Sequence, residues 1–580
     1  MSAAELMAVL LDGHLRMNID NPKDPKGDHL VFSKGHASPL YYSCLKAAGA
    51  IDDGELLSYR RLGSRLEGHP TPRVPWVDVA TGSLGQGLPI AVGLALCAKR
   101  LDRLPSRAWA ICGDSELTEG SIWEAFDHAS FEKLDNLIAI VDVNRLGQTG
   151  ETMHGWDLDV YAERARAFGW EAIEIDGHDV EAIDDAFGRA TRESGRPTVV
   201  LARTVKGKGA EEVEDKPGKH GKPLEDPERA IEQLGGERDL QVRIAAPDTA
   251  DERHRFEPPG GEPPSFDLGD EVPTRKAYGQ ALKALGDTRG DVVALDGEVS
   301  NSTYSELFRD AHPDRYFEMY IAEQQMIAAA VGMQRRGWKP FASTFAAFLT
   351  RAYDFIRMAA VSRANLRLCG SHAGVSIGED GPSQMGLEDL AAFRAVHSST
   401  VLYPCDANQT VGLVELMADR DGISYVRTHR GATPVIYDPN ERFEIGGSRT
   451  LRDGDDVTLV GAGVTLHEAL AAAERLEEDG VHAGVIDLYS VKPIDVDALG
   501  RAGSETGAVV IAEDHWIDGG LGDAVLAALA DAGVSAQVRK LGVRDMPGSG
   551  KPDELMREAG IDAEAIATAA RELVGAASLA

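Results

Sequence analysis

The sequence lacks long apolar runs. Nowhere in its 580 residues does a stretch approach the ~20 consecutive apolar residues that a membrane-spanning helix needs. Hydrophobic residues make up 43% of the chain and charged residues 27%, which is the balance of a soluble globular protein. Residues 1–11 carry no basic cluster ahead of their apolar stretch, so they predict a helix and not a signal peptide. These absences exclude a membrane protein.

Cysteine is scarce. The chain has five cysteines, an odd number, with none of the short cysteine or histidine spacings that bind zinc. They are scattered over the chain: Cys44, Cys97, Cys112, Cys369 and Cys405. We therefore expect a reducing, cytoplasmic location.

Positive charge is in deficit. The formal net charge is −34, which repels phosphate backbones and excludes nucleic acid as a partner. An anionic substrate would need a local basic pocket. The acid excess fits either a soluble, self-repelling surface or adaptation to salt.

Short apolar runs alternate with helical stretches along the whole chain. This pattern predicts an α/β fold of three successive domains, each with a parallel or mostly parallel sheet sandwiched by helices. The predicted domains are residues 1–255 (with a loop region at 206–255), 274–440 and 441–580, and a linker at 256–273 joins the first to the second.

The predicted strands are short and mostly apolar. They are residues 108–114, 137–144, 198–205, 291–296, 316–321, 339–344, 366–372, 400–406, 423–428, 457–463, 485–488 and 508–513. The clearest predicted helices are residues 88–99, 121–133, 322–335 and 466–478.

Polar residues follow two of these strands. Asp114 ends the strand 108–114 and Asn144 ends the strand 137–144. Parallel strands present their carboxyl ends at one edge of a sheet, so these two side chains can converge there. Their oxygens suit Mg²⁺, which also binds the phosphates of a ligand. The alternative is that Asp114 caps the next helix and Asn144 forms a turn.

A glycine-rich turn, residues 82–87 (GSLGQG), precedes the apolar helix 88–99. Free backbone N–H groups at a helix N-terminus bind anions. The spacing differs from the P-loop and from the dinucleotide fingerprint, and glycines also serve tight turns and close helix packing.

Six strings carry a resemblance to a known family. In chain order they are residues 33–37 (SKGHA), 80–87 (ATGSLGQG), 113–116 (GDSE), 321–324 (IAEQ), 343–348 (STFAAF) and 378–382 (GEDGP). Together they resemble transketolase, the thiamine-diphosphate enzyme that moves two-carbon ketol units between sugar phosphates. The similarity extends from residue 2 to about residue 575. Gln384, where many members carry histidine, resembles the animal-type branch.

The resemblance implies thiamine diphosphate as cofactor and Mg²⁺ or Ca²⁺ as its metal. Asp114 and Asn144 would bind the metal through their side chains, and Leu146 through its carbonyl oxygen. The cation would clamp the cofactor diphosphate and supply the charge that an acidic protein lacks. The other residues implied at this end of the cofactor, in the first domain, are His36, Gly82, Ser83, Leu84, Ser115, Glu116 and Lys206. For Lys206 a solvated lysine is an equal alternative.

Glu323 is the expected catalytic acid. By resemblance its carboxyl group hydrogen-bonds the aminopyrimidine of the cofactor, and the apolar residues around it would help it to keep a proton. Phe345, Phe348 and Gln384 would lie beside the same ring. The alternatives are a first-turn acid matched to the helix dipole and two ordinary core aromatics. Domain 274–440 would bind the aminopyrimidine, and domain 441–580 has no assigned chemistry.

Histidines are expected to contact the sugar. His69, His220 and His372 match family positions that contact the reacting groups or shuttle protons, and His36 would serve both cofactor and substrate. Each of them taken singly is more often a surface or structural histidine. We interpret His178 as structural.

Arg275, Ser302 and Arg430 match the residues that hold the sugar phosphate, a task suited to the guanidinium fork. By the same resemblance, Asp380 would recognise the C2 hydroxyl of the donor and set the stereochemical preference.

Two departures from the family pattern affect the expected activity. Members carry about forty residues ahead of the helix that begins here at Ser2, including a histidine that contacts substrate, so this sequence lacks those groups. Ser115 stands where the family has glycine, and its Cβ is tolerable only with a negative φ.

The leading hypothesis is an active transketolase of the pentose phosphate pathway, working as a homodimer with its active sites at the subunit interface. One alternative is a catalytically weakened transketolase-like paralogue that acts by dimerising with a full-length partner. Another is a different thiamine-diphosphate ketol transferase, such as 1-deoxyxylulose-5-phosphate synthase or a split E1-type decarboxylase.

Overall fold

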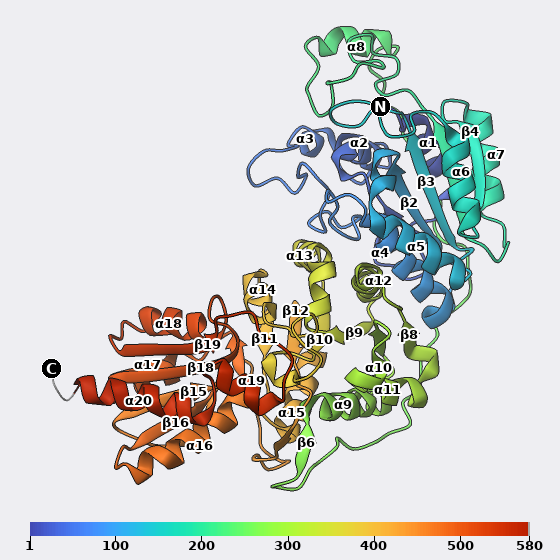
Figure 1. The fold of residues 1–580 in the computed structure, drawn as a ribbon. Coiled ribbons are helices and arrows are strands. Elements are labelled where there is room, and N and C mark those ends of the chain that lie inside the picture. The colour runs from blue at the N-terminus through green and yellow to red at the C-terminus, as the bar shows by residue number, and fades with distance from the viewer. Residues whose placement is uncertain (578–580) are drawn as a thin grey trace. The chain divides into compact units, whose positions relative to one another are not determined.

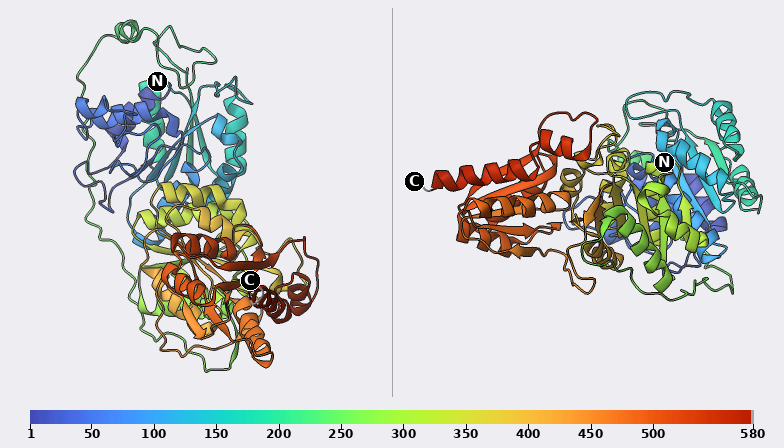
Figure 2. Two further views of the ribbon diagram at one scale, coloured as in Figure 1. Left: turned by 90° about the vertical axis from the view of Figure 1, so that its left-hand side faces the viewer. Right: turned by 60° about the horizontal axis from the view of Figure 1, so that its bottom comes forward.

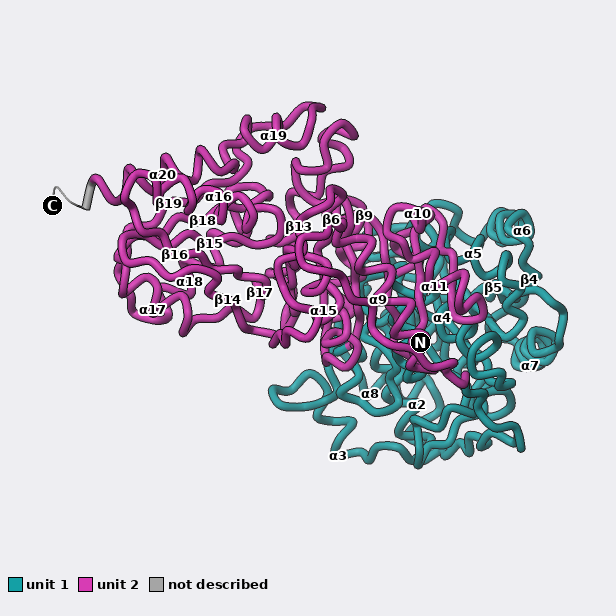
Figure 3. Tube along the Cα trace, turned by 90° about the horizontal axis from the view of Figure 1, so that it is seen from below, with its two compact units in different colours: residues 1–255, 327–337, 361–363 teal, residues 256–326, 338–360, 364–580 magenta. Residues whose placement is uncertain are grey.

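The computed structural model describes residues 1–577, which form two compact units (Figure 3). The first unit holds residues 1–255, 327–337 and 361–363, and the second holds residues 256–326, 338–360 and the rest of the described chain. Each unit has its own sheets and hydrophobic core. Within the described residues, no helix is long and apolar enough to cross a membrane.

The first unit is built on a five-stranded parallel sheet of order β1-β2-β3-β5-β4. All seven residues of the central strand β3 are buried, as expected where helices cover both faces of a parallel sheet. The strands are β1 (His29–Val31), β2 (Ala108–Gly113), β3 (Leu137–Val143), β4 (Glu171–Asp176) and β5 (Thr198–Arg203).

Helix α4 has all ten residues buried and follows directly on the glycine-rich turn. It continues into a π-helical turn, Cys97–Asp102. The helices of this part are α1 (Ala4–Val9), α2 (Ser38–Ala47), α3 (Asp53–Leu56), α4 (Gly87–Leu96), α5 (Gly120–Phe131), α6 (Leu158–Ala167) and α7 (Val180–Ala190).

The predicted loop region 206–255 contains one short helix, α8 (Pro227–Gln233), which Asp226 caps by accepting a hydrogen bond from the Arg229 N–H. Residues 234–270 form neither helix nor strand, and Figure 2 shows this segment as a long extended stretch of chain. The predicted linker 256–273 lies within it up to the short strand β6 (Glu271–Pro273).

The second unit begins with a seven-stranded sheet of order β17-β11-β12-β10-β9-β7-β8. All its pairs are parallel except β11 with β17. Its strands are β7 (Val292–Asp296), β8 (Tyr316–Glu318), β9 (Lys339–Phe345), β10 (Leu366–Ser371), β11 (Thr400–Leu402), β12 (Ile423–Arg427) and β17 (Ser490–Lys492).

The helices between these strands include α12, which begins at Glu323 in the second unit and whose residues from Ile327 onward belong to the first unit. They are α9 (Thr274–Thr288), α10 (Ser300–Thr303), α11 (Glu306–Ala311), α12 (Glu323–Arg335), α13 (Tyr353–Val361), α14 (Asp389–Ala395) and α15 (Ala407–Ala418). A two-stranded antiparallel ladder joins β6 to β13 (Ala432–Pro434).

The C-terminal part of the second unit has a five-stranded sheet of order β14-β16-β15-β18-β19, antiparallel only at β14. Figure 1 shows α16 and α20 on one face and α17 and α18 on the other. The elements are β14 (Arg449–Arg452), β15 (Val457–Gly461), β16 (Ala483–Asp487), β18 (Ala508–Trp516), β19 (Gln537–Val543), α16 (Val464–Glu478), α17 (Val496–Thr506), α18 (Leu521–Asp531), α19 (Pro552–Glu558) and α20 (Ala563–Ala577).

One hydrophobic core runs through the whole second unit. A single buried cluster extends from Tyr278 to Leu573, and strand β17 from the C-terminal part pairs with β11. Burial of this shared apolar surface stabilises the two sheets together. The sequence pattern predicted two separate domains here, but the two sheets share one hydrophobic cluster and one strand pair.

The predicted α/β class with parallel or mostly parallel sheets is confirmed. Seven strands were missed: β1, β4, β6, β13, β14, β17 and β19. β4 and β19 each present exposed positions between their apolar residues, so they lack the continuous apolar run by which buried strands are recognised. β1 has only three residues.

Arg427 forms a fully buried ion pair with Asp389, with Nε 2.8 Å from Oδ2. We expect Arg427→Leu to destabilise the second unit by about 3–5 kcal/mol, because it leaves the Asp389 carboxylate buried without its partner. Urea unfolding followed by circular dichroism measures this loss. The matched control is Arg452→Leu, whose ion pair with Glu477 is exposed and which should cost about 0–1 kcal/mol. Equal losses in the two variants would contradict the prediction.

Candidate active site

The first unit gathers one set of predicted residues at the carboxyl edge of its sheet, which we call the first half-site (Asp114, Asn144, Leu146, Lys206 and their neighbours). Gly113 at the end of β2 pairs with Asp142 of β3, so Asp114 and Asn144 follow neighbouring strands. The Asp114 Oδ2 accepts hydrogen bonds from the Arg145 N–H at 2.7 Å and from Thr152 Oγ1 at 3.2 Å. Burial raises the pKa of Asp114.

Glu116 ties three loops of the first half-site together. Its Oε1 accepts from the Gly85 N–H at 2.8 Å and from the Ser33 hydroxyl, and its Oε2 accepts from the Gly113 N–H at 3.1 Å. The side chain is 1% exposed, and burial raises its pKa. Glu116 therefore holds the glycine-rich turn and the end of β2 in a common position.

The glycine-rich turn needs glycine at Gly82. Its φ is +128°, and a Cβ there would lie 2.9 Å from Cδ2 of His69. The His69 ring therefore packs directly on the turn. Ser83 and Leu84 follow in the same turn, where Leu84 is exposed.

Ser115 opens a 3-10 turn, Ser115–Thr118, a conformation with negative φ. Ser115 therefore has the negative φ that its Cβ requires. Its backbone N–H donates to Asp114 Oδ1 at 2.9 Å, so in this structure the donor expected to approach an anion is directed at Asp114.

Lys206 lies on the carbonyl oxygen predicted to bind a metal. Its Nζ donates to the Leu146 oxygen at 2.7 Å and lies 2.9 Å from Nδ1 of His220. The His220 ring centroid is 4.6 Å from that of His36. Burial, followed by the Lys34 ammonium, lowers the pKa of Lys206. The structure therefore brings Lys206, Leu146, His220 and His36 together.

Asp142 and Lys34 form a buried ion pair that sequence reasoning missed. Although burial raises the pKa of Asp142, the Lys34 ammonium beside it holds this pKa at about 2. Asp142 also accepts from Nδ2 of Asn144 at 3.2 Å, and the Asn144 amide oxygen accepts from the Leu146 N–H at 3.2 Å. The available signals were a lysine inside the string 33–37 and an acid inside an apolar strand.

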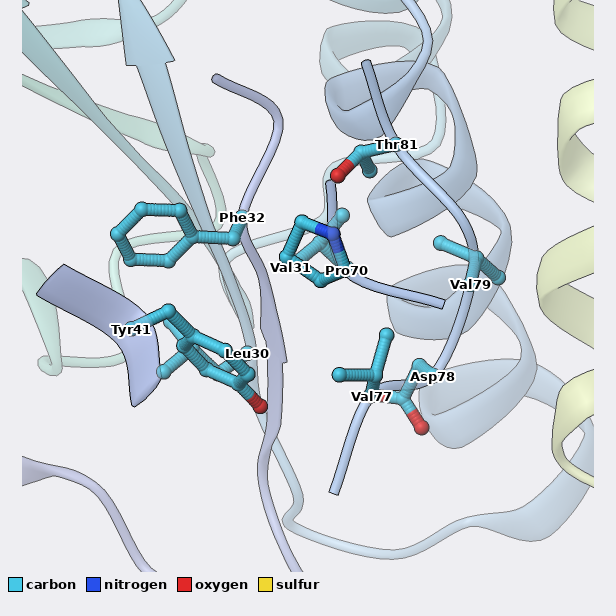
Figure 4. Close-up of a pocket in the computed structure, with 9 residues that line it drawn as sticks. All are labelled: Leu30, Val31, Phe32, Tyr41, Pro70, Val77, Asp78, Val79 and Thr81. Atoms are coloured by element: carbon cyan, nitrogen blue, oxygen red, sulfur yellow. The ribbon is translucent and has the colours of Figure 1, made fainter. Parts of the chain in front are cut away.

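A separate pocket near this region is not part of the half-site. Figure 4 shows its nine lining residues, which are mostly apolar and include Val31, Pro70 and Thr81. Several of them, such as Phe32 and Tyr41, belong to the main hydrophobic cluster of the first unit. None of the nine is a predicted site residue, so we interpret this pocket as imperfect packing.

The second unit gathers the remaining residues in the second half-site (Glu323, Phe345, Phe348 and His372, with Arg275, Ser302, Asp380 and Arg430). Glu323 begins α12 and is 2% exposed. Arg351 Nη1 lies 2.9 Å from Oε1 and 3.1 Å from Oε2 of Glu323. The Arg351 guanidinium also lies over the Phe348 ring, 5.2 Å from its centroid. Sequence reasoning missed Arg351, which stands three residues after Phe348 and carried no separate signal.

Aromatic rings form a stack that Arg351 links to Glu323. Phe345 stacks on Phe348 with centroids 5.2 Å apart and on His372 with centroids 3.9 Å apart. His372 has a left-handed φ of +55°, a conformation that costs energy for a non-glycine residue and concentrates at functional sites. Burial, with the Arg275 and Arg430 charges, lowers the pKa of His372 to about 3.

Two arginines and an acid lie together as predicted. Arg275 donates from Nη1 to the Ser302 carbonyl oxygen at 2.9 Å and from Nε to the Arg430 carbonyl oxygen at 3.3 Å. Arg430 Nη1 lies 3.2 Å from Asp380 Oδ2. Gln384 is on the same loop as Asp380, and its Nε2 lies 3.5 Å from Ser383 Oγ.

The two half-sites have complementary chemistry. The first offers lysines, histidines, a carboxylate and backbone carbonyls, a set suited to an anion together with a cation. The second offers a buried carboxyl group against stacked aromatic rings, with arginines for a second anion.

Comparison with family models agrees with this geometry. The model "Transketolase, thiamine diphosphate binding domain" matches residues 1–250, "Transketolase, pyrimidine binding domain" matches residues 270–435, and "Transketolase, C-terminal domain" matches residues 446–566. The fold and site thus define a thiamine-diphosphate-binding enzyme.

Individual relatives narrow this class. The chain is 48% identical to "Transketolase" of Homo sapiens, over 99% of this chain and 93% of the relative, and 46% identical to "Transketolase-like protein 2" of Mus musculus, with the same coverage. It is 25% identical to the crystal structure of transketolase from Campylobacter jejuni, with a TM-score of 0.85 over 98% of this chain and 94% of that one. The chain belongs to the transketolase family.

We expect the His372 ring to stay uncharged in the folded protein down to about pH 3. The free energy of unfolding should therefore decrease in acid. The unfolded chain takes up a proton on this ring below about pH 6.5 and the folded chain does not, so the stability contribution is complete above pH 6.5 and is lost as the pH falls. At about pH 5 the loss is about 2 kcal/mol.

Urea unfolding at about pH 7.5 and about pH 5 measures this effect. In His372→Gln the difference between the two conditions should shrink by about 2 kcal/mol, whereas the exposed His397→Gln serves as the matched control. A wild-type pH dependence in His372→Gln would show that this ring is charged in the folded protein.

Proposed function

We propose that this chain is an active transketolase that reversibly transfers a two-carbon ketol unit from a ketose phosphate to an aldose phosphate. The bond between C2 and C3 of the donor breaks and C2 bonds to C1 of the acceptor, so no oxidant or reductant is needed. The observation that carries the proposal is the buried Glu323 carboxyl group, linked through Arg351 to the stack of Phe345, Phe348 and His372, in a chain of which 99% aligns with a member of this family.

The first half-site would bind the diphosphate of thiamine diphosphate, and the second half-site would bind an aminopyrimidine ring. When bound, this cofactor supplies a carbanion equivalent that accepts and releases the ketol unit. Glu323, which is 2% exposed, would hydrogen-bond the pyrimidine ring through its carboxyl group. Phe345 and Phe348 present a flat aromatic surface for the ring. Arg351, now on Glu323, would have to give up these two contacts.

A divalent cation, Mg²⁺ or Ca²⁺, would be bound by Asp114, Asn144 and the Leu146 carbonyl oxygen. The hydrogen bond from the Lys206 ammonium to the Leu146 oxygen supports this assignment, because this oxygen already accepts from a cation. Among the described residues no group of three or more His, Cys, Asp or Glu side chains could hold a metal. That fits a site in which one carboxylate is joined by an amide, a backbone oxygen and ligand phosphates.

The sugar phosphates would be bound by the remaining residues. Arg275 and Arg430, with Ser302, suit the phosphate group. Ser371 Oγ lies 3.0 Å from Nδ1 of His372, which leaves Nε2 of this uncharged ring for a sugar hydroxyl or carbonyl.

Four further residues are proposed from the sequence to contact the sugar. His69 and His220, with His36, would contact the reacting part of the sugar. A ketose has a carbonyl group at C2, so the C2 hydroxyl that Asp380 can accept from belongs to the aldose acceptor rather than to the donor.

A homodimer with its active sites at the subunit interface is part of the proposal. Ile321, 69% exposed, and the exposed Tyr320 stand directly before the buried Glu323, and such apolar exposure beside a buried acid suits a surface that a second copy covers. Five free cysteines support a reducing cytoplasm, and the reaction would belong to the pentose phosphate pathway.

Two alternatives remain testable. Ser115, whose N–H is directed at Asp114, is the observation that favours a catalytically weakened paralogue, and one relative is itself named a transketolase-like protein. A different thiamine-diphosphate ketol transferase would use the same half-sites with another acceptor.

The purified chain with thiamine diphosphate and Mg²⁺, given xylulose 5-phosphate and ribose 5-phosphate, should form sedoheptulose 7-phosphate. Glu323→Gln should lower turnover at least about 100-fold, because the amide cannot donate and recover a proton as the carboxyl group does. Sedimentation should show the same dimer for both proteins. Turnover retained in Glu323→Gln would overturn the assigned role, and a dimer without any product would favour the weakened paralogue.

Asp114→Asn should weaken binding of thiamine diphosphate in the presence of Mg²⁺ at least about 10-fold. The amide keeps an oxygen for the Ser115 N–H but removes the charge that the metal needs. Isothermal titration calorimetry measures the affinity, and a chelator should weaken wild-type binding in the same way. Asp127→Asn, at an exposed position on α5, is the matched control. Unchanged affinity in Asp114→Asn would remove Asp114 from the metal site.

A further inference from the structure

Residues 374–386, which we call the recognition loop, carry two of the proposed site residues, Asp380 and Gln384. The loop begins two residues after His372, and its ends are joined by a hydrogen bond from the Gly374 N–H to the Gly386 oxygen at 2.8 Å. The course of this closed loop therefore determines where the Asp380 carboxylate stands.

A carboxylate from the C-terminal part of the chain anchors the start of the recognition loop. Asp514, on β18, accepts from the Val375 N–H at 2.6 Å and from the Ser376 N–H at 3.2 Å, and it is 0% exposed. Gly374 permits this approach, since a Cβ there would lie 2.0 Å from Asp514 Oδ2.

The middle of the loop also rests on the C-terminal part. Gly378 and Gly381 both have a positive φ, of 86° and 82°. A Cβ on Gly378 would lie 3.1 Å from Pro552 Cδ, and one on Gly381 would lie 2.7 Å from Ser549 Oγ. These glycines therefore serve both the turn conformation and the close approach.

The apolar side chains of the loop are buried in a small core with the same partner. Val375, Ile377, Met385 and the adjacent Leu387 form one cluster with residues of the C-terminal part: Val464, Val543, Leu555, Met556 and Ile561. Burial of this apolar surface holds the underside of the loop in place.

Two arginines complete the support. Arg427 Nη2 donates to the Gly386 oxygen at 2.9 Å and to the Asp514 carbonyl oxygen at 2.7 Å. Arg430, assigned above to the sugar phosphate, donates to the Ile377 oxygen at 2.9 Å. The loop is thus held on its substrate side by Arg430 and on its other side by the C-terminal part.

We propose that Asp514 is a positioning residue for sugar recognition, and that the C-terminal domain, through it, shapes the loop that orients Asp380. This inference rests on the proposed function, because it assumes that Asp380 contacts a sugar hydroxyl. It gives a role in substrate selection to a domain whose residues do not line either half-site.

Asp514→Asn in the full-length chain tests the proposal. The amide group would meet one of the two backbone N–H groups with its own donors, so at least one hydrogen bond is lost. We expect amide hydrogen exchange in residues 374–386 to become at least about 10-fold faster, with residues 366–371 unchanged. Preference for ribose 5-phosphate over its C2 epimer, arabinose 5-phosphate, should fall at least about 10-fold in kcat/KM, while affinity for thiamine diphosphate stays at the wild-type value.

The matched control is Asp487→Asn, the same substitution at another fully buried position of the C-terminal domain. Asp487 accepts from Gln409 and Tyr437 and not from the loop, so this variant should lose stability but keep the loop protection and the epimer preference. Wild-type exchange and preference in Asp514→Asn, or equal changes in both variants, would overturn the proposal.

A second pair of variants serves if Asp514→Asn does not fold. Gly381→Ala introduces a Cβ against Ser549, whereas Gly480→Ala has a similar φ of 78° with nothing within 4 Å. Only Gly381→Ala should loosen the loop and lower the epimer preference, and equal effects would overturn the proposal. A wild-type chain without turnover would overturn the proposed function alone, because hydrogen exchange reports on the loop without any substrate.

Discussion

The first half-site depends on the buried carboxyl group of Glu116. Parallel strands bring Ser33, Gly85 and Gly113 to one edge of the sheet, but only a shared acceptor fixes the distances between them. Because Glu116 is nearly inaccessible to water, losing it would leave buried donors without partners, which is more costly than losing an exposed bond. The buried Glu116 carboxyl group thus determines the positions of the loops that an anion would contact.

Although the chain is strongly acidic, several lysine and arginine side chains of the half-sites are hydrogen-bonded to backbone carbonyl oxygens. Lys206 lies on the Leu146 oxygen and Arg275 on the Ser302 oxygen, whereas Arg430, on the Ile377 oxygen, also lies 3.2 Å from Asp380 Oδ2. A carbonyl dipole orients a cation without neutralising its charge, so the charge remains available to a phosphate. Lys34 differs, since its charge is neutralised by Asp142. Lys34 therefore has a structural role, because its partner Asp142 is hydrogen-bonded to Asn144 at the end of β3.

The sequence predicted the elements with continuous apolar runs, and it predicted that Asp114 and Asn144 follow the ends of neighbouring strands, as the structure has them. The roles of Phe345 and the other site residues came from the family resemblance and stay predictions. It did not predict partners such as Arg351 on Glu323 or Asp142 on Lys34, because these contacts join residues whose spacing carries no periodic signal. Glu116 was predicted at the cofactor from a motif, but its three hydrogen bonds depend on how separate loops meet. Strand β4 was missed because its exposed positions dilute the apolar pattern.

Strand β17 lies in the last third of the chain and yet forms the edge of the preceding sheet, where it pairs with β11. A chain shortened before residue 490 would therefore expose the unpaired backbone of β11 along with the shared core. Open strand edges of this kind pair with other molecules and promote aggregation. The last domain and the surface that receives it therefore form one folding unit.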